Sequence, residues 1–62
     1  MKSDEEILAE EILKYRVKNN LTQNEFASKC GIGRCSLIAA EKCSPSISKK
    51  MRTKIMLFIE NN

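Results

Sequence analysis

The side chains that could carry out covalent or metal chemistry are few in this chain. It has three cysteines, Cys30, Cys35 and Cys43, and no histidine. A structural zinc site needs four Cys or His ligands, and a cysteine nucleophile needs a nearby general base. The Gly31–Gly33 segment lacks the third glycine and the preceding strand of a dinucleotide-binding loop. Because no catalytic set can be assembled, the composition favours a binding protein over an enzyme and predicts neither a metal nor a cofactor.

Charge is the second chemical signal, because it is distributed unevenly along the sequence. Residues 1–11 hold one lysine against five acidic residues, a local charge of −4, whereas residues 12–62 hold ten lysines and arginines against three glutamates, a local charge of +7. A basic body fits the binding of a polyanion such as nucleic acid. An acidic helix start followed by an ordinary solvated lysine surface explains the same charges without any partner. Charge alone leaves both interpretations open.

Length and composition predict one small globular domain. The chain has 62 residues, of which 42% are hydrophobic and 31% are charged, with only two glycines and one proline. No apolar run is long enough for a membrane span, and the acidic N-terminus lacks the pattern of a signal peptide. An odd number of cysteines fits a reducing compartment. We therefore expect a soluble, cytoplasmic protein that makes no membrane contact.

Helix start and stop signals predict a compact all-α domain of four, or four to five, helices. Ser3 or Asp4 caps a first helix that runs to about residue 18, and Thr22 with Glu25 forms a capping box for a second that Gly31 ends. A third helix spans about 34–42, and a fourth begins after Ser48. The side chains expected to face the core recur at helical spacing, and they are Leu8, Ile12, Tyr15, Phe26, Ala27, Cys30, Leu37, Ala40, Met51, Ile55, Phe58 and Ile59.

The second and third helices, over about residues 22–42, have the layout of a helix-turn-helix. Two helices of about eight residues are joined by a tight turn that contains Gly31. Small Ala27 lets the two helices approach each other, and apolar Ile32 and Leu37 fix the angle between them. This layout allows the second helix of the pair to enter a DNA major groove, which accepts one helix.

The segment YRVKNNLTQNEFASKCGIGRCSLIAAEK resembles the helix-turn-helix domains of the phage-repressor, Cro and Xre type. Its most specific part is the L-T-Q-x-E-[LF]-A-x-x-x-G-[VI] pattern of Leu21–Ile32, and the similarity covers roughly residues 8–60. The resemblance implies a lambda-repressor-like fold. It also implies a sequence-specific DNA-binding transcriptional regulator, a repressor of a phage, plasmid or bacterial chromosome, located in the cytoplasm on the nucleoid and binding double-stranded DNA.

The resemblance also implies roles for individual residues. Arg16 and Glu41 fall at the positions of a structural ion pair. The positions over the base edges are Gly33, Arg34, Cys35, Ile38 and Ala39. The positions near DNA phosphates are Gln23, Ser36, Lys42 and Ser44. A domain this small reads DNA best as a dimer on a pseudo-palindrome, and Met56 and Leu57, off the apolar stripe of the fourth helix, are the candidate homodimer surface.

The predicted recognition helix carries little that can read a base. Arg34 alone can make a bidentate contact to guanine, while Cys35, Ile38 and Ala39 can only contact thymine methyl groups or exclude water. An exposed Ile38 beside Ala39 would serve equally well to bind a protein. An antirepressor, an antitoxin or an inhibitor of a host factor, using Ile38, Ala39, Leu57 and the acidic segment 1–11, is therefore the alternative function.

Overall fold

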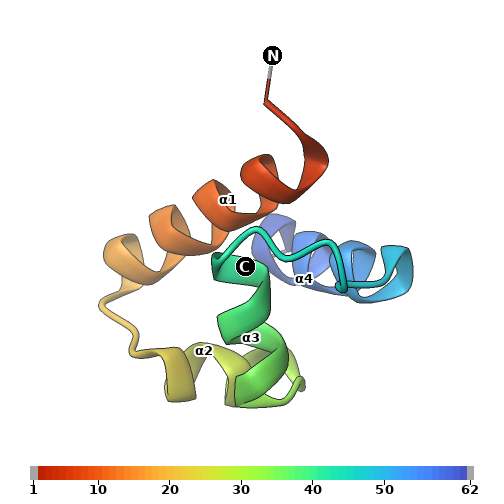
Figure 1. Ribbon diagram of the computed structural model, residues 1–62. Coiled ribbons are helices and arrows are strands. Elements are labelled where there is room, and N and C mark those ends of the chain that lie inside the picture. Colours follow the sequence, from red (N-terminus) through yellow and green to blue (C-terminus); the bar gives the residue numbers. More distant parts are fainter. Residues whose placement is uncertain (1, 62) are drawn as a thin grey trace.

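The fold is all-α in the part of the chain that the computed structural model describes, residues 2–61. The helices are α1 (Asp4–Asn19), α2 (Gln23–Cys30), α3 (Arg34–Glu41) and α4 (Lys49–Glu60). Figure 1 shows α1 lying above the short α2–α3 pair, with α4 behind them. The predicted four-helix domain is confirmed, and α3 ends at Glu41, with Lys42 as its C-cap. No helix within residues 2–61 is long and apolar enough to cross a membrane.

Side-chain caps start three of the four helices. Ser3 and Thr22 each accept a hydrogen bond from the backbone N–H three residues on, and Glu6 and Glu25 accept one in return, which completes two capping boxes. The hydrogen bond from the Thr22 backbone N–H, with that of its side chain, holds the pKa of Glu25 below its ordinary value. Ser48 caps α4. The α3 helix has Gly33 as its N-cap and no side-chain cap, so its start depends on packing.

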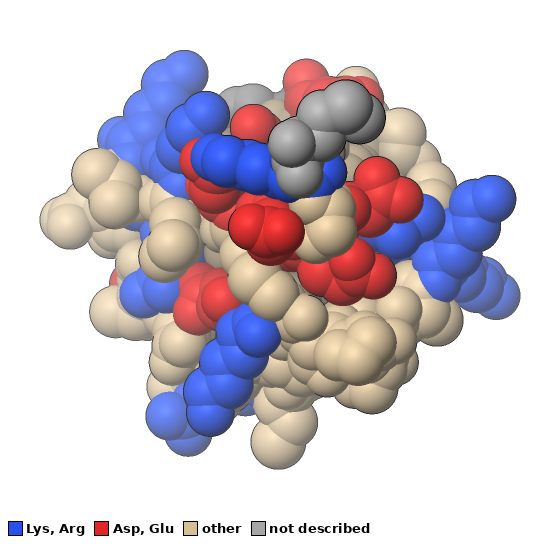
Figure 2. Space-filling model, turned by 45° about the horizontal axis from the view of Figure 1, so that its top comes forward, with Lys and Arg blue, Asp and Glu red and all other residues tan. Residues whose placement is uncertain are grey.

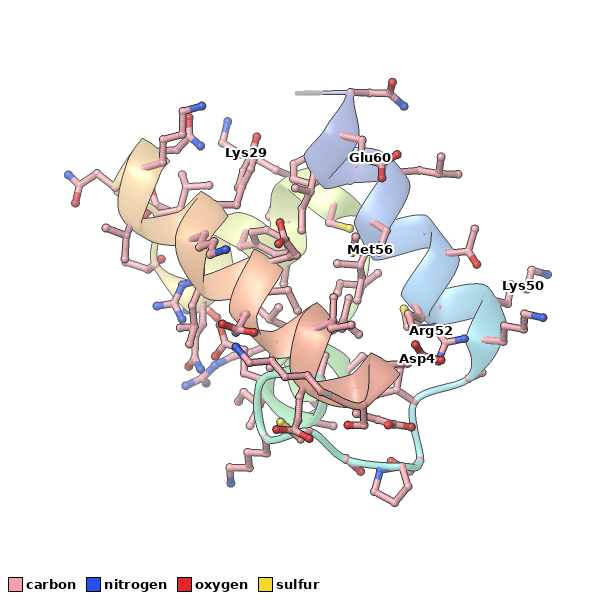
Figure 3. All side chains as sticks on the ribbon, turned by 90° about the horizontal axis from the view of Figure 1, so that it is seen from above. Asp4, Lys29, Lys50, Arg52, Met56 and Glu60 are labelled. Atoms are coloured by element: carbon pink, nitrogen blue, oxygen red, sulfur yellow. The ribbon has the colours of Figure 1, made fainter. Side chains whose placement is uncertain are left out.

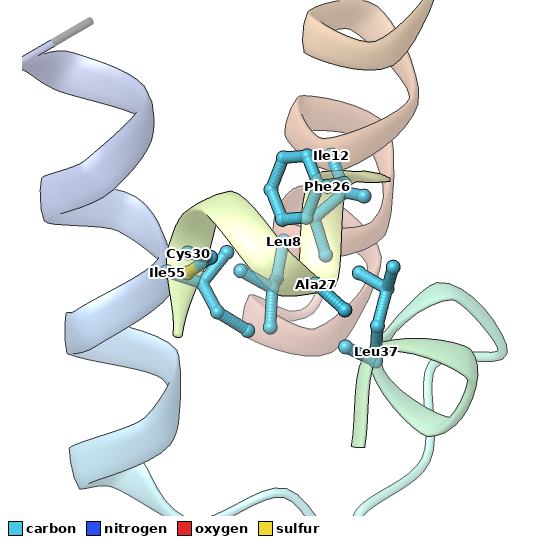
Figure 4. Packing of buried hydrophobic residues seen from close by; sticks show 8 residues of the cluster. Leu8, Ile12, Phe26, Ala27, Cys30, Leu37 and Ile55 are labelled. Carbon is cyan, nitrogen blue, oxygen red and sulfur yellow. The ribbon is translucent and has the colours of Figure 1, made fainter. Parts of the chain in front are cut away.

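The hydrophobic core takes one large, fully buried side chain from each helix. These are Ile12 of α1, Phe26 of α2, Leu37 of α3 and Ile55 of α4. Leu8, Ala27, Cys30 and Ala40 complete the buried cluster, part of which is drawn in Figure 4. Met51, Phe58 and Ile59 pack against this cluster half-buried. The apolar faces predicted from helical spacing are therefore confirmed, and their convergence fixes how α2 and α3 sit on α1 and α4.

Two residues after α2 and α3 adopt the left-handed backbone conformation. Gly31 has φ +78° and Cys43 has φ +59°. A residue with a Cβ pays about 1–2 kcal/mol for this conformation, which glycine adopts freely. Cys43 thus occupies a glycine-type position after α3.

Exchanging the residue types at these two turns is expected to change stability in opposite directions. Cys43→Gly should raise the free energy of unfolding by about 0.5–1 kcal/mol, because relief of strain exceeds the added entropy of the unfolded chain. Gly31→Ala should lower it by about 1 kcal/mol or more. A Cβ at Gly31 would meet only the flexible Lys54 side chain, at 3.8 Å, so the cost there is backbone strain. Urea unfolding followed by circular dichroism measures both, and equal stabilities would contradict the strain argument.

Candidate nucleic-acid interface

The α3 helix is held from one side and exposed at its N-terminal end. It packs against α1 and α2 through buried Leu37 and Ala40, and α4 packs against α1 and α2 instead of covering α3. Three of the predicted base-contacting residues, Gly33, Arg34 and Cys35, are exposed. The start of α3 lies at the lower end of this helix in Figure 1, away from α1. The start of this helix is therefore accessible to a large partner.

The expectation of an exposed apolar spot at Ile38 and Ala39 is wrong, because both residues are half-buried. Ile38 directly follows buried Leu37, about 100° further round the helix, so it lies on the flank of α3. The Ala39 carbonyl accepts hydrogen bonds from the N–H groups of Lys42 and Ser44, at 3.2 and 3.0 Å. The chain beyond α3 thus folds back over the end of the helix. Both apolar residues therefore offer a partner less surface than exposed residues would.

A network of three side chains holds the C-terminal end of α3. Arg16 of α1 donates to Glu41 at 2.6 Å, which confirms the predicted ion pair, and their side chains are 22% and 10% exposed. Gln23 of α2 donates from Nε2 to the other carboxylate oxygen of Glu41, also at 2.6 Å. Arg16 further donates from Nε to the Leu21 carbonyl at 3.2 Å. One carboxylate therefore joins α1 and α2 to α3, which fixes the orientation of α3 relative to these two helices.

The residues predicted to contact phosphates differ in their exposure and in whether their side chains already have hydrogen-bond partners. Lys42 is exposed and, like Arg34, makes no ion pair or hydrogen bond through its side chain in the described part of the chain. Gln23 is half-buried and already holds Glu41. The Ser44 hydroxyl accepts from the Ser46 backbone at 3.2 Å and shares a hydrogen bond with the Ser46 hydroxyl. Ser36 is half-buried on α3. Among the predicted contact residues, Arg34 and Lys42, at the two ends of α3, are therefore the cations without a side-chain partner within residues 2–61.

A contact absent from the sequence interpretation supports the turn between α2 and α3. Lys54 of α4 donates from Nζ to the carbonyl of Gly31 at 3.2 Å. This carbonyl stands at the C-terminal end of α2, where backbone oxygens lack helical partners and a cation is favoured. No spacing in the sequence identifies a lysine of one helix as the partner of a turn 23 residues away. The turn is thus held by α4 as well as by its own glycine.

Acidic side chains gather over the N-terminal half of α1, as Figure 2 shows, while lysines and arginines lie mainly toward the edge of that view. A hydrogen bond from Lys2 lowers the pKa of Glu10 in this group. The start of α3 lies at the opposite end of the molecule in Figure 1. The acidic segment therefore does not flank the exposed end of α3, where it would repel a polyanion.

The three cysteines fall into two environments. Cys30 is buried in the core, and desolvation by burial raises the pKa of its thiol. Cys35 and Cys43 are exposed, the first within the candidate site. Among residues 2–61, no group of three or more Cys, Asp or Glu side chains is placed to hold a metal ion.

The candidate site is thus the exposed first turn of α3, where Arg34 has no partner among residues 2–61. The network of Arg16, Gln23 and Glu41, called the clamp below, holds the far end of the helix. These features come from separate elements that the core brings together. Comparison of the chain with protein-family models, curated proteins and solved structures found no match.

Proposed function

We propose that this protein is a DNA-binding transcriptional regulator of the Cro/repressor type that places the N-terminal half of α3 in the major groove. One observation carries the proposal. The α3 helix is held at its C-terminal end by Glu41 with Arg16 and Gln23, and it is exposed at its N-terminal end, where Arg34 has no ion-pair partner among residues 2–61. A reading helix needs this combination, since the positions of its contacts are fixed only when the helix itself is fixed.

In this proposal Arg34 makes the main sequence-specific contact with a base. Its guanidinium would make a bidentate contact with O6 and N7 of a guanine, which is worth about 1–3 kcal/mol of discrimination. Gly33 allows close backbone approach, and Cys35 with the exposed edges of Ile38 and Ala39 would contact thymine methyl groups. Lys42 would neutralise a phosphate beyond the far end of α3. Gln23, Ser36 and Ser44 are secondary phosphate candidates, because the side chains of Gln23 and Ser44 already have partners and Ser36 is half-buried.

A single copy with so few contacts would bind weakly, so two copies on a pseudo-palindrome belong to the proposal. The half-sites would lie about 34–36 Å apart, one turn of the DNA helix. On α4, Leu57 is 51% exposed, whereas Met56 is half-buried and packs against the core. Leu57 is therefore the stronger of the two candidates for the surface between the copies.

Selection of bound sites from a random duplex pool tests this function. Variants of Arg34 then separate the preference for a base from the attraction of a positive charge to DNA. The wild-type chain should enrich a symmetric motif with a guanine in each half-site. Arg34→Lys keeps the charge but loses the bidentate fork, so preference at that guanine should fall by about tenfold while affinity for unrelated DNA stays unchanged. Arg34→Ala should also weaken the unrelated complex and reduce its salt dependence.

The matched control is Lys14→Ala, which removes the same charge from an exposed position on α1. It should leave the enriched motif unchanged. If no motif is enriched, and affinity for duplex DNA does not depend on salt concentration, the proposed function is contradicted.

A protein-binding module is the second candidate, and the exposed apolar side chains of α1 favour it. Val17 is 81% exposed and Leu13, four residues before it, is 47% exposed. Two such residues at helical spacing form a ridge that a partner helix or groove could cover. This candidate predicts that Val17→Glu abolishes binding of the partner protein, whereas Arg34→Ala leaves that binding intact.

A further inference from the structure

The outward face of α4 carries opposite charges at its two ends with an apolar side chain between them. Lys50, Thr53, Leu57 and Glu60 are all exposed. Their spacing of three, four and three residues places them on one face of the helix. Figure 3 shows Lys50 and Glu60 at opposite ends of α4. Because a two-fold axis pairs a surface with its own reverse, such a face is complementary to itself.

From this face we infer that two copies of the chain pair through α4 in antiparallel orientation. When Leu57 of one copy lies opposite Thr53 of the other, Lys50 lies opposite Glu60, since three residues separate the members of each pair along the helix. Because of the two-fold symmetry, every contact occurs twice. The pairing therefore brings two Lys50–Glu60 ion pairs to the ends of the interface and two leucines to its centre.

The shape of the surface around Leu57 fits the same arrangement. A hollow of about 330 Å³ lies between α1 and α4, and its lining includes apolar Ile7, Leu8, Met56 and Leu57 together with acidic Asp4 and Glu60. Asp4 is paired with Arg52 at 3.5 Å, which leaves Glu60 as the acidic lining residue without an ion-pair partner among residues 2–61. A second copy would seat its Leu57 beside this hollow and bring a lysine to Glu60.

The extent of the interface sets its strength. A helix of 12 residues is only about 18 Å long, and one helix pair buries less than the roughly 800 Å² per partner of a standard stable interface. The pairing is therefore weak, with dissociation at micromolar or higher concentrations. This inference specifies the dimer of the proposed function, but its test involves no DNA, so either one can fail without the other.

Charge reversal provides the test, measured as the dimer dissociation constant by sedimentation equilibrium. Lys50→Glu and Glu60→Lys should each weaken self-association by about tenfold or more, because two attractive pairs become two repulsive ones. Mixing these two variants should restore association as a heterodimer, in which every pair is again Glu with Lys. The doubly substituted chain, with Lys50→Glu and Glu60→Lys together, should dimerise as the wild type does. Leu57→Glu should abolish association.

Lys14→Glu, which alters an exposed lysine of α1, is the control for net charge and should have no effect. Circular dichroism of every variant confirms that the helices are retained, since all the substituted positions are exposed. A wild-type chain that is monomeric at millimolar concentration overturns the inference. Loss of association in both single variants without rescue in the mixture or in the doubly substituted chain overturns it equally, because the residues would then not face each other.

Discussion

Replacing Glu41 by alanine is expected to lower the free energy of unfolding by about 3 kcal/mol. The substitution leaves the guanidinium of Arg16 and the amide of Gln23, both partly buried, without their shared acceptor. Removing one partner from a fully buried pair costs about 3–5 kcal/mol, and the residual exposure of both side chains here places the cost at the lower end. A domain of 62 residues has roughly 3–9 kcal/mol of stability, so a large part of it would be lost.

The controls for Glu41→Ala separate the network from charge in general. Glu11→Ala removes the acid of a long, exposed pair with Lys14 (3.8 Å) and should change the unfolding free energy by less than about 0.5 kcal/mol. Glu41→Gln keeps a hydrogen-bond acceptor for Arg16 or Gln23 and should cost less than the alanine variant. Urea unfolding measures all three. Equal stability of Glu41→Ala and Glu11→Ala would show that the clamp contributes nothing.

The Glu41 variants also bear on function. If DNA reading requires a fixed α3, Glu41→Ala studied at a temperature where it is still folded should lose preference for the enriched motif more than it loses affinity for unrelated duplex. The clamp lies at the end of α3 opposite to Arg34, and Glu41 carries no charge that attracts DNA. A selective loss of preference would therefore come from the orientation of the helix.

The fold could be predicted from the sequence because its signals are local. Thr22 and Glu25 form their capping box within one turn, and Gly31 ends the same helix after its eight residues. Apolar residues at spacings of three and four then identify the inward faces, as Ile12 and Leu37 illustrate. Such features depend only on backbone geometry that every helix shares, so no knowledge of the tertiary arrangement is needed.

The site was less predictable, because its contacts join residues that are distant in the sequence. Glu41 meets Gln23 across 18 residues and Lys54 meets Gly31 across 23, and neither pair has a spacing signal. The Arg16–Glu41 pair was expected only through the resemblance of the segment to known helix-turn-helix domains. The backbone hydrogen bond from Ser44 to the Ala39 carbonyl, which turns the chain back after α3, has no sequence signal either.

The exposed apolar residues of α1 show a different limit. Helical spacing assigned Leu8 and Ile12 to the core, and the same spacing places Leu13 and Val17 on another face. That signal was present in the sequence, but a pattern that identifies an outward apolar residue does not tell what covers it. The function of such a surface can be assigned only when the partner that covers it is known.

Replacing Phe26 by alanine is expected to have the largest effect of any single change, a loss of about 4 kcal/mol or more in unfolding free energy. The ring is fully buried and makes edge contacts with Tyr15 of α1 (ring centroids 5.6 Å apart) and Phe58 of α4 (5.4 Å). These contacts add about 0.5–1.5 kcal/mol each to the burial of the ring. Because Phe26 is the one residue of the three on α2, its removal weakens the packing of α2 against both α1 and α4.

The matched control for Phe26→Ala is Val17→Ala, a truncation of an 81% exposed side chain that should change stability by less than about 0.5 kcal/mol. Phe26→Leu keeps most of the apolar volume, so it should lose about 1–2 kcal/mol and stay folded. Thermal unfolding of this intermediate variant then provides a sensitive assay, since a ligand that binds only the native state raises its midpoint. A duplex carrying the selected motif should raise the midpoint more than an unrelated duplex does, and Arg34→Lys in the same background should remove the difference. Equal shifts from both duplexes in the Phe26→Leu chain that retains Arg34 would mean that α3 binds DNA without discriminating between sequences.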